Sequence, residues 1–231
     1  AIEVNGIIYT SGQIPVNPAT GEIPEGIEAQ AEQVMENVKI TTRAGMDFYE
    51  GHIHDKDVVV VKCGIGKVNA AICTQILADR YKVDSVINTG VAGSLNSDID
   101  ICDIVISKDA IEHDMDVTAL GYERGVIPDM DNSVFHSDSR LIDVAVKSIE
   151  EANLSVKVFT GRVVSGDQFI AGKEKKDDLV NTFAGDCAEM EGASIAHAAY
   201  VNNIPCLIIR AISDKADGSA QVDYPTFEKQ A

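Results

Sequence analysis

The run Cys206-Leu207-Ile208-Ile209-Arg210-Ala211-Ile212-Ser213-Asp214 is the best guide to the fold, because an apolar segment here ends in a hydroxyl and a carboxylate. The segment Cys206–Ile209 predicts a strand buried on both faces, since such strands read as continuous apolar runs. Four other short, largely apolar segments have the same character: Val58–Val61, Ser85–Asn88, Asp103–Ile106 and Val158–Val164. We therefore expect a central sheet that contains these five segments.

Helical patterns lie between some of the strand segments, at Lys67–Tyr81, Ser139–Asn153 and Ala188–Asn202. The pattern in Ser139–Asn153 places its apolar side chains on one face, and Asp138 or Ser137 can cap its start. Strands that alternate with helices indicate an α/β fold. We expect a mixed, largely parallel central sheet flanked by helices.

Composition narrows the class of protein. The chain has 231 residues, enough for one α/β domain, and 45% of them are hydrophobic but only 5% aromatic, so the core must be aliphatic. The net charge of −18 argues against nucleic acid or an anionic membrane as a partner. No apolar run approaches the roughly 20 residues of a membrane helix, and no signal peptide is visible. Five scattered cysteines without a CxxC pair indicate reduced thiols and a cytoplasmic protein.

Turn-forming residues follow the expected strands and predict where a ligand binds. These turns are Gly64-Ile65-Gly66, Thr89-Gly90-Val91-Ala92-Gly93 and Ser165-Gly166-Asp167. In open α/β sheets, ligands bind outside the carboxyl ends of the strands. We therefore expect the site at these turns and at Ser213-Asp214.

The residue types at these positions suit the cleavage of a nucleoside. Glu189-Met190-Glu191 places two carboxylates around a thioether at the start of an expected helix, and carboxylates can hold ribose hydroxyls. Asp214 could supply the acid that a departing purine needs. Each has a structural alternative: Asp214 can cap a turn, and a glutamate is favourable at any helix start. Phe169, which follows a turn, could equally be a buried anchor of its loop.

From about Lys39 onward the chain resembles the 5′-methylthioadenosine/S-adenosylhomocysteine nucleosidases of the nucleoside phosphorylase superfamily. The resemblance rests on several stretches in the same order and spacing: Tyr49-Glu50-Gly51, Gly64-Ile65-Gly66-Lys67-Val68, Ile87-Asn88-Thr89-Gly90-Val91-Ala92-Gly93, His113-Asp114-Met115-Asp116-Val117-Thr118-Ala119, Gly121-Tyr122, Ser165-Gly166-Asp167-Gln168-Phe169-Ile170, Glu189-Met190-Glu191-Gly192-Ala193 and Arg210-Ala211-Ile212-Ser213-Asp214. It implies a three-layer α/β/α fold and hydrolysis of an N-glycosidic bond with release of adenine, a step of methionine salvage.

The resemblance also implies roles for individual residues. Asp214 would protonate the purine near N7, oriented by Ser213, and Glu191 would bind the ribose and favour its cationic transition state. Met190 would lie against the sugar, with Glu189 supporting Glu191. The other substrate contacts implied are stacking on Phe169, the backbone at Ile170, Ala92 and Gly93, and Ile65 on the ribose and 5′ side. Many relatives carry a hydroxyl residue where Val91 stands, so no side-chain hydrogen bond is expected there.

In relatives, the positions of Leu120, Tyr122 and Pro128 reach a neighbouring subunit's 5′ pocket, which implies a homodimer. The preceding stretch Glu112-His113-Asp114-Met115-Asp116 does not match the common metal-site patterns. We expect no metal and no cofactor.

Residues 1–38 resemble the start of a different family, the reactive-intermediate (imine/enamine) deaminases. The match is Val4-Asn5-Gly6-Ile7-Ile8-Tyr9-Thr10-Ser11-Gly12-Gln13-Ile14-Pro15, then Asn17-Pro18 and Thr20-Gly21-Glu22. Val4–Thr10 predicts a strand, and a fragment this short is not expected to form an independent domain. It stands where the nucleosidases have a first strand reading G-x-x-G-A-M-x-x-E, whose glutamate activates the attacking water. We therefore expect residues 39–231 to be a nucleosidase-like domain truncated at both ends, with impaired hydrolysis.

Two other functions remain open. A phosphate-dependent purine nucleoside phosphorylase would share the fold, but the Gly-Asp-Pro-x-Arg loop that grips phosphate in such enzymes is not found in the sequence. A non-catalytic nucleoside-binding protein would keep the pocket without the chemistry.

Overall fold

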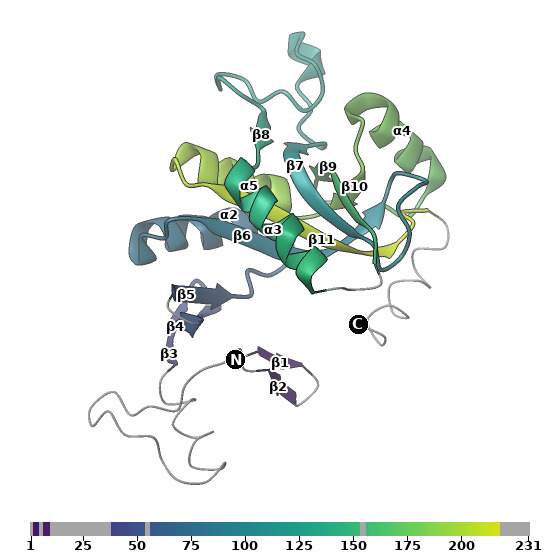
Figure 1. Ribbon diagram of the computed structural model, residues 1–231. Helices are drawn as coiled ribbons and strands as arrows, with labels where there is room; N and C mark the ends of the chain where they lie inside the picture. The colour runs from purple at the N-terminus through teal and green to yellow at the C-terminus, as the bar shows by residue number, and fades with distance from the viewer. Residues whose placement is uncertain (1, 5–6, 10–37, 54–55, 153–155, 218–231) are drawn as a thin grey trace, which may run out of the picture. The chain divides into compact units, whose positions relative to one another are not determined.

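The computed structural model describes residues 2–4, 7–9, 38–53, 56–152 and 156–217. It divides into two compact units, residues 1–64 and residues 65–231 (Figure 1).

The first unit holds an antiparallel sheet of β3 (Lys39–Arg43), β4 (Met46–Ile53) and β5 (Lys56–Val61). Ala44 and Gly45 connect β3 to β4, and both have positive φ, as a tight two-residue hairpin requires. The strand predicted at Val58–Val61 is present as part of β5, but its expected place in the central sheet was wrong, because β5 pairs with β4 in this separate antiparallel sheet. Its neighbour β4 buries Met46 and Phe48.

The start of the chain differs from the single strand predicted at Val4–Thr10. The structure has two short antiparallel strands, β1 (Ile2–Val4) and β2 (Ile7–Tyr9), with Val4 paired to Ile7. The intervening sequence Asn5-Gly6 is strongly favoured in two-residue hairpins, which explains the difference. Residues 10–37, the rest of the deaminase-like segment, lie outside the described residues.

The second unit contains a six-stranded mixed sheet in the order β11-β6-β10-β9-β7-β8. Its strands are β6 (Val86–Ser94), β7 (Ile104–Glu112), β8 (Val134–His136), β9 (Val158–Ser165), β10 (Cys187–Glu189) and β11 (Cys206–Asp214). The pairs β11–β6, β10–β9 and β7–β9 are parallel, and the other pairs are antiparallel. Since β11 also pairs with β7, five of these strands close into a ring.

Two strands are longer than predicted, and this changes how the site is built. The glycine-rich run Thr89–Gly93 belongs to β6 rather than to a loop, and Ser213 and Asp214 are the last residues of β11. Pairing extends both strands, because β11 forms a ladder with β6 from Val86 to Gly93.

Helices accompany the sheet: α2 (Lys67–Ile76), continued by a π-helical turn η1 (Leu77–Tyr81), then α3 (Ser139–Glu151), α4 (Lys173–Phe183) and α5 (Gly192–Val201). A short 3₁₀ turn, η2, spans Thr118–Leu120. Asp138 caps α3 as predicted, with the Leu141 N–H 3.1 Å from its Oδ1. Within the described residues, no helix is both long and apolar enough to span a membrane.

The helix predicted at Ala188–Asn202 begins later than expected. Residues Cys187–Glu189 form β10 instead, because they pair with both β9 and β6. Helix α4 was not predicted, since most of its residues are charged or polar and only Leu179 and Phe183 are buried.

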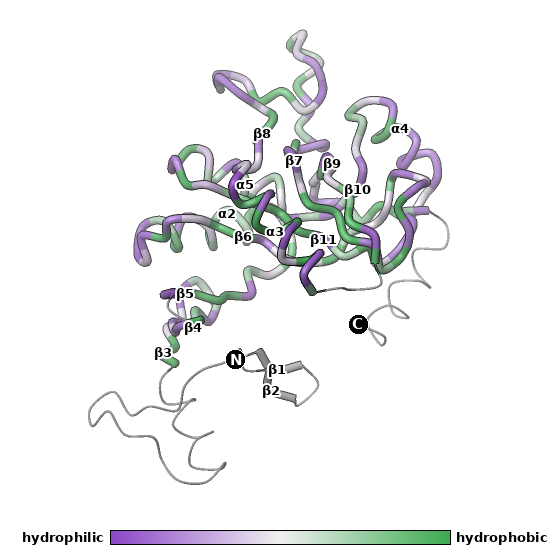
Figure 2. Tube along the Cα trace, viewed as in Figure 1, coloured by the Kyte–Doolittle hydropathy of each residue, from purple (hydrophilic) through white to green (hydrophobic). Residues whose placement is uncertain are grey.

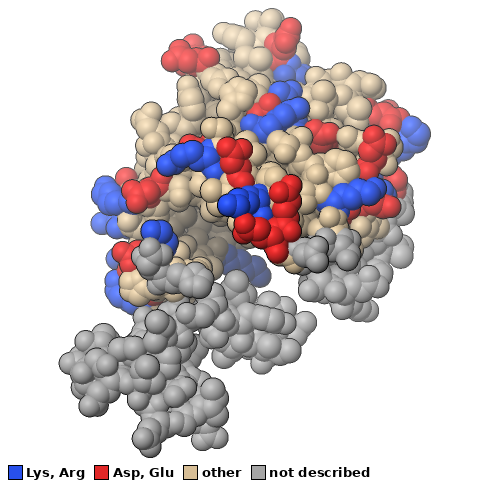
Figure 3. All heavy atoms as spheres, viewed as in Figure 1, with Lys and Arg blue, Asp and Glu red and all other residues tan. Residues whose placement is uncertain are grey.

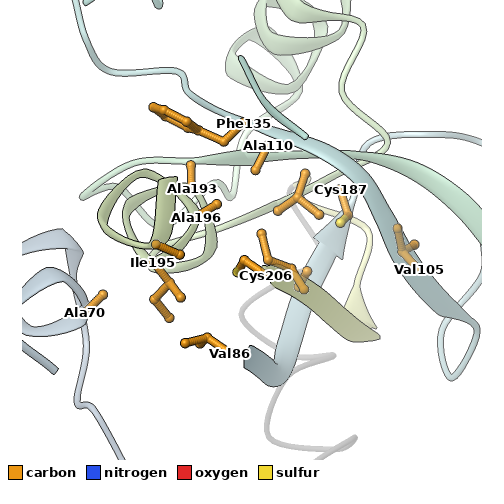
Figure 4. Close-up of a cluster of buried hydrophobic side chains, with 14 of the residues drawn as sticks. Ala70, Val86, Val105, Ala110, Phe135, Cys187, Ala193, Ile195, Ala196 and Cys206 are labelled. Carbon is orange, nitrogen blue, oxygen red and sulfur yellow. The ribbon is translucent and has the colours of Figure 1, made fainter. Parts of the chain in front are cut away.

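The core is aliphatic, as the composition requires. Val105, Val163, Ile208 and Ile212 are all within 1% of complete burial. Small residues of α5, including Ala193 and Ala196, pack onto this layer (Figure 4). In Figure 2 the apolar colour follows much of β7 and β10.

Candidate active site

Strand register brings the ends of several strands of the second unit together. Glu112, Ser165 and Glu189 occupy one paired row across β7, β9 and β10. In the adjacent row, Gly93 of β6 pairs with Ala188 on one side and with Asp214 on the other. Neighbouring strands lie about 4.8 Å apart. Asp214 therefore lies about two strand spacings from Ala188, the residue that precedes Glu189 in β10.

Glu189 is a buried carboxylate surrounded by donors. It accepts hydrogen bonds from Arg210 Nη2 at 2.5 Å, from the Gly192 N–H at 2.8 Å and from the Ser165 hydroxyl. Burial opposes its charge, but Arg210 and Ser165 outweigh burial and hold the pKa of Glu189 below its usual value. Glu189 is therefore ionised, and its carboxylate oxygens already accept hydrogen bonds from the protein. This fits a residue that supports Glu191 from behind.

Glu191 lies at the N-cap of α5 and faces the Gly64-Ile65-Gly66 turn. Its Oε1 accepts the Gly66 N–H at 2.9 Å. Burial and the nearby charge of Glu189 raise the pKa of Glu191, although the Gly66 N–H works in the opposite direction. Met190, between the two carboxylates, is half-buried.

Asp214 is 2% exposed and its carboxyl group is held at both oxygens. The Ser213 hydroxyl donates to Oδ2 at 2.8 Å, and the Ala216 N–H donates to Oδ1 at 2.8 Å. The contact predicted between Ser213 and Asp214 is therefore present. Gly93 packs against the same carboxyl group, since a Cβ atom there would lie 2.7 Å from Oδ1.

The loop after β9 is joined to the start of α2. Asp167 Oδ1 accepts the Lys67 N–H at 2.8 Å, and the Asp167 N–H donates to Asp114 Oδ2 at 2.9 Å. A Cβ atom on Gly66 would lie 3.0 Å from Asp167 Oδ1, so Gly66 touches this loop as well as Glu191.

Phe169 is 55% exposed, so it is not the buried loop anchor that was the structural alternative. Ile170, the next residue, is buried and supports the loop from within. Ile65 is 74% exposed on the neighbouring turn. The side chains of Ile65 and Phe169 are thus both exposed to solvent, on the turn and the loop that meet at Gly66.

The remaining predicted residues divide into two groups. Ala92 and Gly93 are buried beside Asp214, and the Ala92 carbonyl accepts the Ser213 hydroxyl at 3.4 Å. Leu120 and Tyr122 are exposed and Pro128 is half-buried, on the segment between β7 and β8.

Sequence reasoning missed Arg210 and Ser165 as parts of the site. Arg210 is 1% exposed and also bonds the Asn88 side chain through Nη2. A single charge inside the apolar run of β11 was a usable signal, because a buried charge requires a partner. The sequence alone did not indicate which of its carboxylates that partner would be.

Comparisons with known proteins show the family of the chain. A family model described as the phosphorylase superfamily matches residues 19–231. The chain is 41% identical over 196 residues to a 5′-methylthioadenosine/S-adenosylhomocysteine nucleosidase of Staphylococcus saprophyticus, covering 84% of this chain and 85% of the relative.

Solved structures give the same result. A nucleosidase of the same description from Colwellia psychrerythraea, in complex with adenine, matches with a TM-score of 0.80 and 37% identity over 84% of this chain and 81% of that one. A futalosine hydrolase of Helicobacter pylori matches with a TM-score of 0.79 and 32% identity over 84% and 82%.

Proposed function

The chain belongs to the phosphorylase superfamily, and we propose that it hydrolyses the N-glycosidic bond of 5′-methylthioadenosine or S-adenosylhomocysteine and releases adenine. The main support is the placement of three carboxylates, joined to 41% identity with nucleosidases of that description. Glu189 ends β10 and Asp214 ends β11, the two strands that flank β6, and Glu191 caps α5 directly after β10. The Colwellia psychrerythraea relative was solved with adenine bound, which supports the same base here.

Asp214 is the proposed general acid. Breaking the bond sends negative charge onto the purine, and a proton delivered near N7 lowers the barrier, an effect worth about 10²–10⁴ in rate. The hydroxyl of Ser213 and the N–H of Ala216 restrict the carboxyl group to one orientation. An acid held in this way needs no reorganisation when the bond breaks.

Glu191 is the proposed partner of the sugar. The departing purine leaves a ribosyl group with cationic character, and a nearby carboxylate stabilises that charge. Glu189 and Arg210 neutralise one another behind it, so that Glu191 is the carboxylate left to face the ribose. The exposed ring of Phe169 provides an apolar face on which adenine can stack.

We also propose that hydrolysis is slower than in the relatives. The stretch G-x-x-G-A-M-x-x-E, whose glutamate activates water in this family, has no counterpart in the sequence. Cleavage by water needs a base on one side of the bond and an acid on the other, as paired carboxylates supply in glycoside hydrolysis. The acid is Asp214, and no residue is assigned as the base.

Adenine release from methylthioadenosine tests the function directly. Asp214→Asn should abolish release while adenine still binds, because the amide cannot donate the required proton but keeps the shape. The exposed Asp131→Asn variant is the matched control and should behave as the wild type. A wild-type chain that neither releases nor binds adenine would refute the proposal. Turnover that requires phosphate would indicate a phosphorylase, and binding without any product a nucleoside-binding protein.

A further inference from the structure

Lys67, the first residue of α2, is the centre of a partly buried cluster of charges. Its ammonium nitrogen lies 2.7 Å from Asp114 Oδ1 and 3.1 Å from Glu112 Oε2. The three side chains keep only 20%, 15% and 8% of their exposure, in the order Lys67, Asp114, Glu112. Ion pairs shielded from water interact more strongly than pairs on the surface. The cluster therefore ties the start of α2 to the end of β7.

Helix α5 joins the same cluster. His197 Nδ1 lies 2.9 Å from Glu112 Oε1, and its ring stacks on Phe135 at 4.7 Å between centroids. The Ser194 hydroxyl also donates to the Lys67 carbonyl at 2.8 Å. Ser194 lies in the first turn of the helix that Glu191 caps, so Lys67 contacts the element that presents the ribose carboxylate.

The backbone of Lys67 reaches the loop that carries Phe169. Its N–H donates to Asp167 Oδ1, two residues before Phe169. Asp114 accepts hydrogen bonds from both the Lys67 ammonium and the Asp167 N–H. Lys67, Asp114 and Asp167 are therefore each hydrogen-bonded to the other two. The preceding residue, Gly66, donates its own N–H to Glu191.

From these contacts we propose that Lys67 is a positioning residue that holds the Phe169 loop and Glu191 together in the geometry that binds the nucleoside. The inference deepens the proposed function and rests on it. Loops have low local stability, and a displacement of about 1 Å in a site can cost about 10² in rate. The Lys67 side chain holds Asp114, which binds the loop through the Asp167 N–H, and Glu112, which binds His197 of α5. These links limit such displacement.

The protonation states favour a permanent cluster. Burial lowers the pKa of Lys67, but its bonds to Asp114 and Glu112 outweigh burial and raise that pKa above its usual value. Burial also opposes the charge of Glu112, but His197 and Lys67 outweigh it and hold the pKa of Glu112 below its usual value. Burial opposes the charge of Asp114 as well, and Lys67 holds the pKa of that carboxyl group below its usual value. All three groups carry charge near neutral pH.

The test compares Lys67→Met with Lys67→Arg. Methionine keeps the length of the side chain but removes its charge, so kcat/KM for adenine release should fall by about 10²-fold, with a raised KM. Arginine can bridge two carboxylates and should recover most of the loss. Hydrogen exchange at the amides of residues 165–169 should speed up in Lys67→Met. The exposed Lys147→Met variant on α3, which loses only a pair with Glu151 at 3.7 Å, is the control and should change neither readout.

Ser194→Ala provides a milder variant that leaves no charge unpaired, in case Lys67→Met does not fold. It removes only the bond to the Lys67 carbonyl and should raise KM by about 3- to 10-fold, the value of roughly one hydrogen bond. A folded Lys67→Met protein with unchanged KM and unchanged exchange at residues 165–169 would overturn the inference. If the wild type releases no adenine, the proposed function fails. The exchange measurement still tests the positioning role in that case: faster exchange at residues 165–169 in Lys67→Met supports the role, and unchanged exchange refutes it.

Discussion

Glu189 and Arg210 form an ion pair within the sheet at a distance of 2.5 Å, with both side chains almost fully buried. Such a pair costs desolvation, and it persists where further hydrogen bonds satisfy the remaining atoms. Ser165, Gly192 and Asn88 provide such bonds, and of the polar atoms of this pair only Arg210 Nε is left without a hydrogen-bond partner among the described residues. Removal of one partner leaves the other charge buried and unpaired, which is a large cost to stability.

Glu189→Gln should therefore lower the free energy of unfolding by about 3–5 kcal/mol at pH 7. The pKa of Glu189 in the folded chain lies below its unfolded value, so the ionised group stabilises the fold above about pH 4.3 and this contribution is lost as pH falls further. Urea unfolding at pH 7 and at about pH 3 should show the difference from wild type shrinking with acid. The exposed Glu150→Gln is the control and should change stability by less than about 0.5 kcal/mol. An equal loss in Glu189→Gln at both pH values would contradict this account.

Phe169→Ala isolates the adenine contact. Stacking of a base on an aromatic ring is worth about 1–3 kcal/mol, so KM for methylthioadenosine should rise by about 10- to 100-fold. The ring is 55% exposed, and stability should stay within about 0.5 kcal/mol of wild type. Val201→Ala, at the same exposure on α5, is the matched control for both steady-state kinetics and thermal unfolding. An unchanged KM would show that adenine does not stack there.

At the scale of elements, the ladder between β6 and β11 decides where the acid lies. The register shifts between Ile212 and Asp214, and Gly93 then pairs with Asp214. The absence of a side chain at Gly93 is what permits the two strands to approach at this point, because a Cβ atom would also lie 2.9 Å from the Cβ atom of Ala216.

Gly93→Ala should therefore push Asp214 out of position. We expect kcat to fall by about 10²-fold from a displacement of about 1 Å, with a loss of stability of about 1–3 kcal/mol from overpacking. Gly172→Ala is the control, since a Cβ atom at Gly172 meets no atom within 4 Å. Single-turnover adenine release measures the effect, and equal rates in the two variants would show that the ladder does not position the acid.

At the scale of the whole molecule, the net charge of −18 does not produce an unbroken acidic surface. Figure 3 shows lysine and arginine side chains interspersed with aspartate and glutamate on the visible face. Large apolar side chains are also exposed, among them Leu120 at 75% and Tyr122 at 41%. An exposed leucine beside an exposed tyrosine suits contact with a second copy, which supports the proposed homodimer.

The homodimer implied by the family resemblance predicts that Leu120→Asp gives monomers and raises KM for methylthioadenosine, because a neighbouring subunit would no longer cover the 5′ group. Sedimentation velocity at micromolar concentration measures the first effect and steady-state kinetics the second. Val144→Asp on α3, where the side chain is 63% exposed, is the control. A wild-type chain that sediments as a monomer would exclude this arrangement.

The sequence by itself determined the α/β class, the central strands, the α3 helix with its Asp138 cap, and the residue types on which the proposed chemistry rests. These features are local: apolar runs, helical periodicity and capping chemistry are each expressed within about fifteen neighbouring residues. The resemblance carried by the motifs added the family, which the comparisons bear out.

The tertiary structure alone decided which groups meet. Strands β6 and β11 extend beyond their apolar runs because each is a partner for the other, and β10 replaces a helical turn because it pairs on both sides. The partner of Arg210 is Glu189, and Lys67 is joined to groups 45 or more positions away. Such contacts depend on chain closure over long separations, which no local pattern in the sequence specifies.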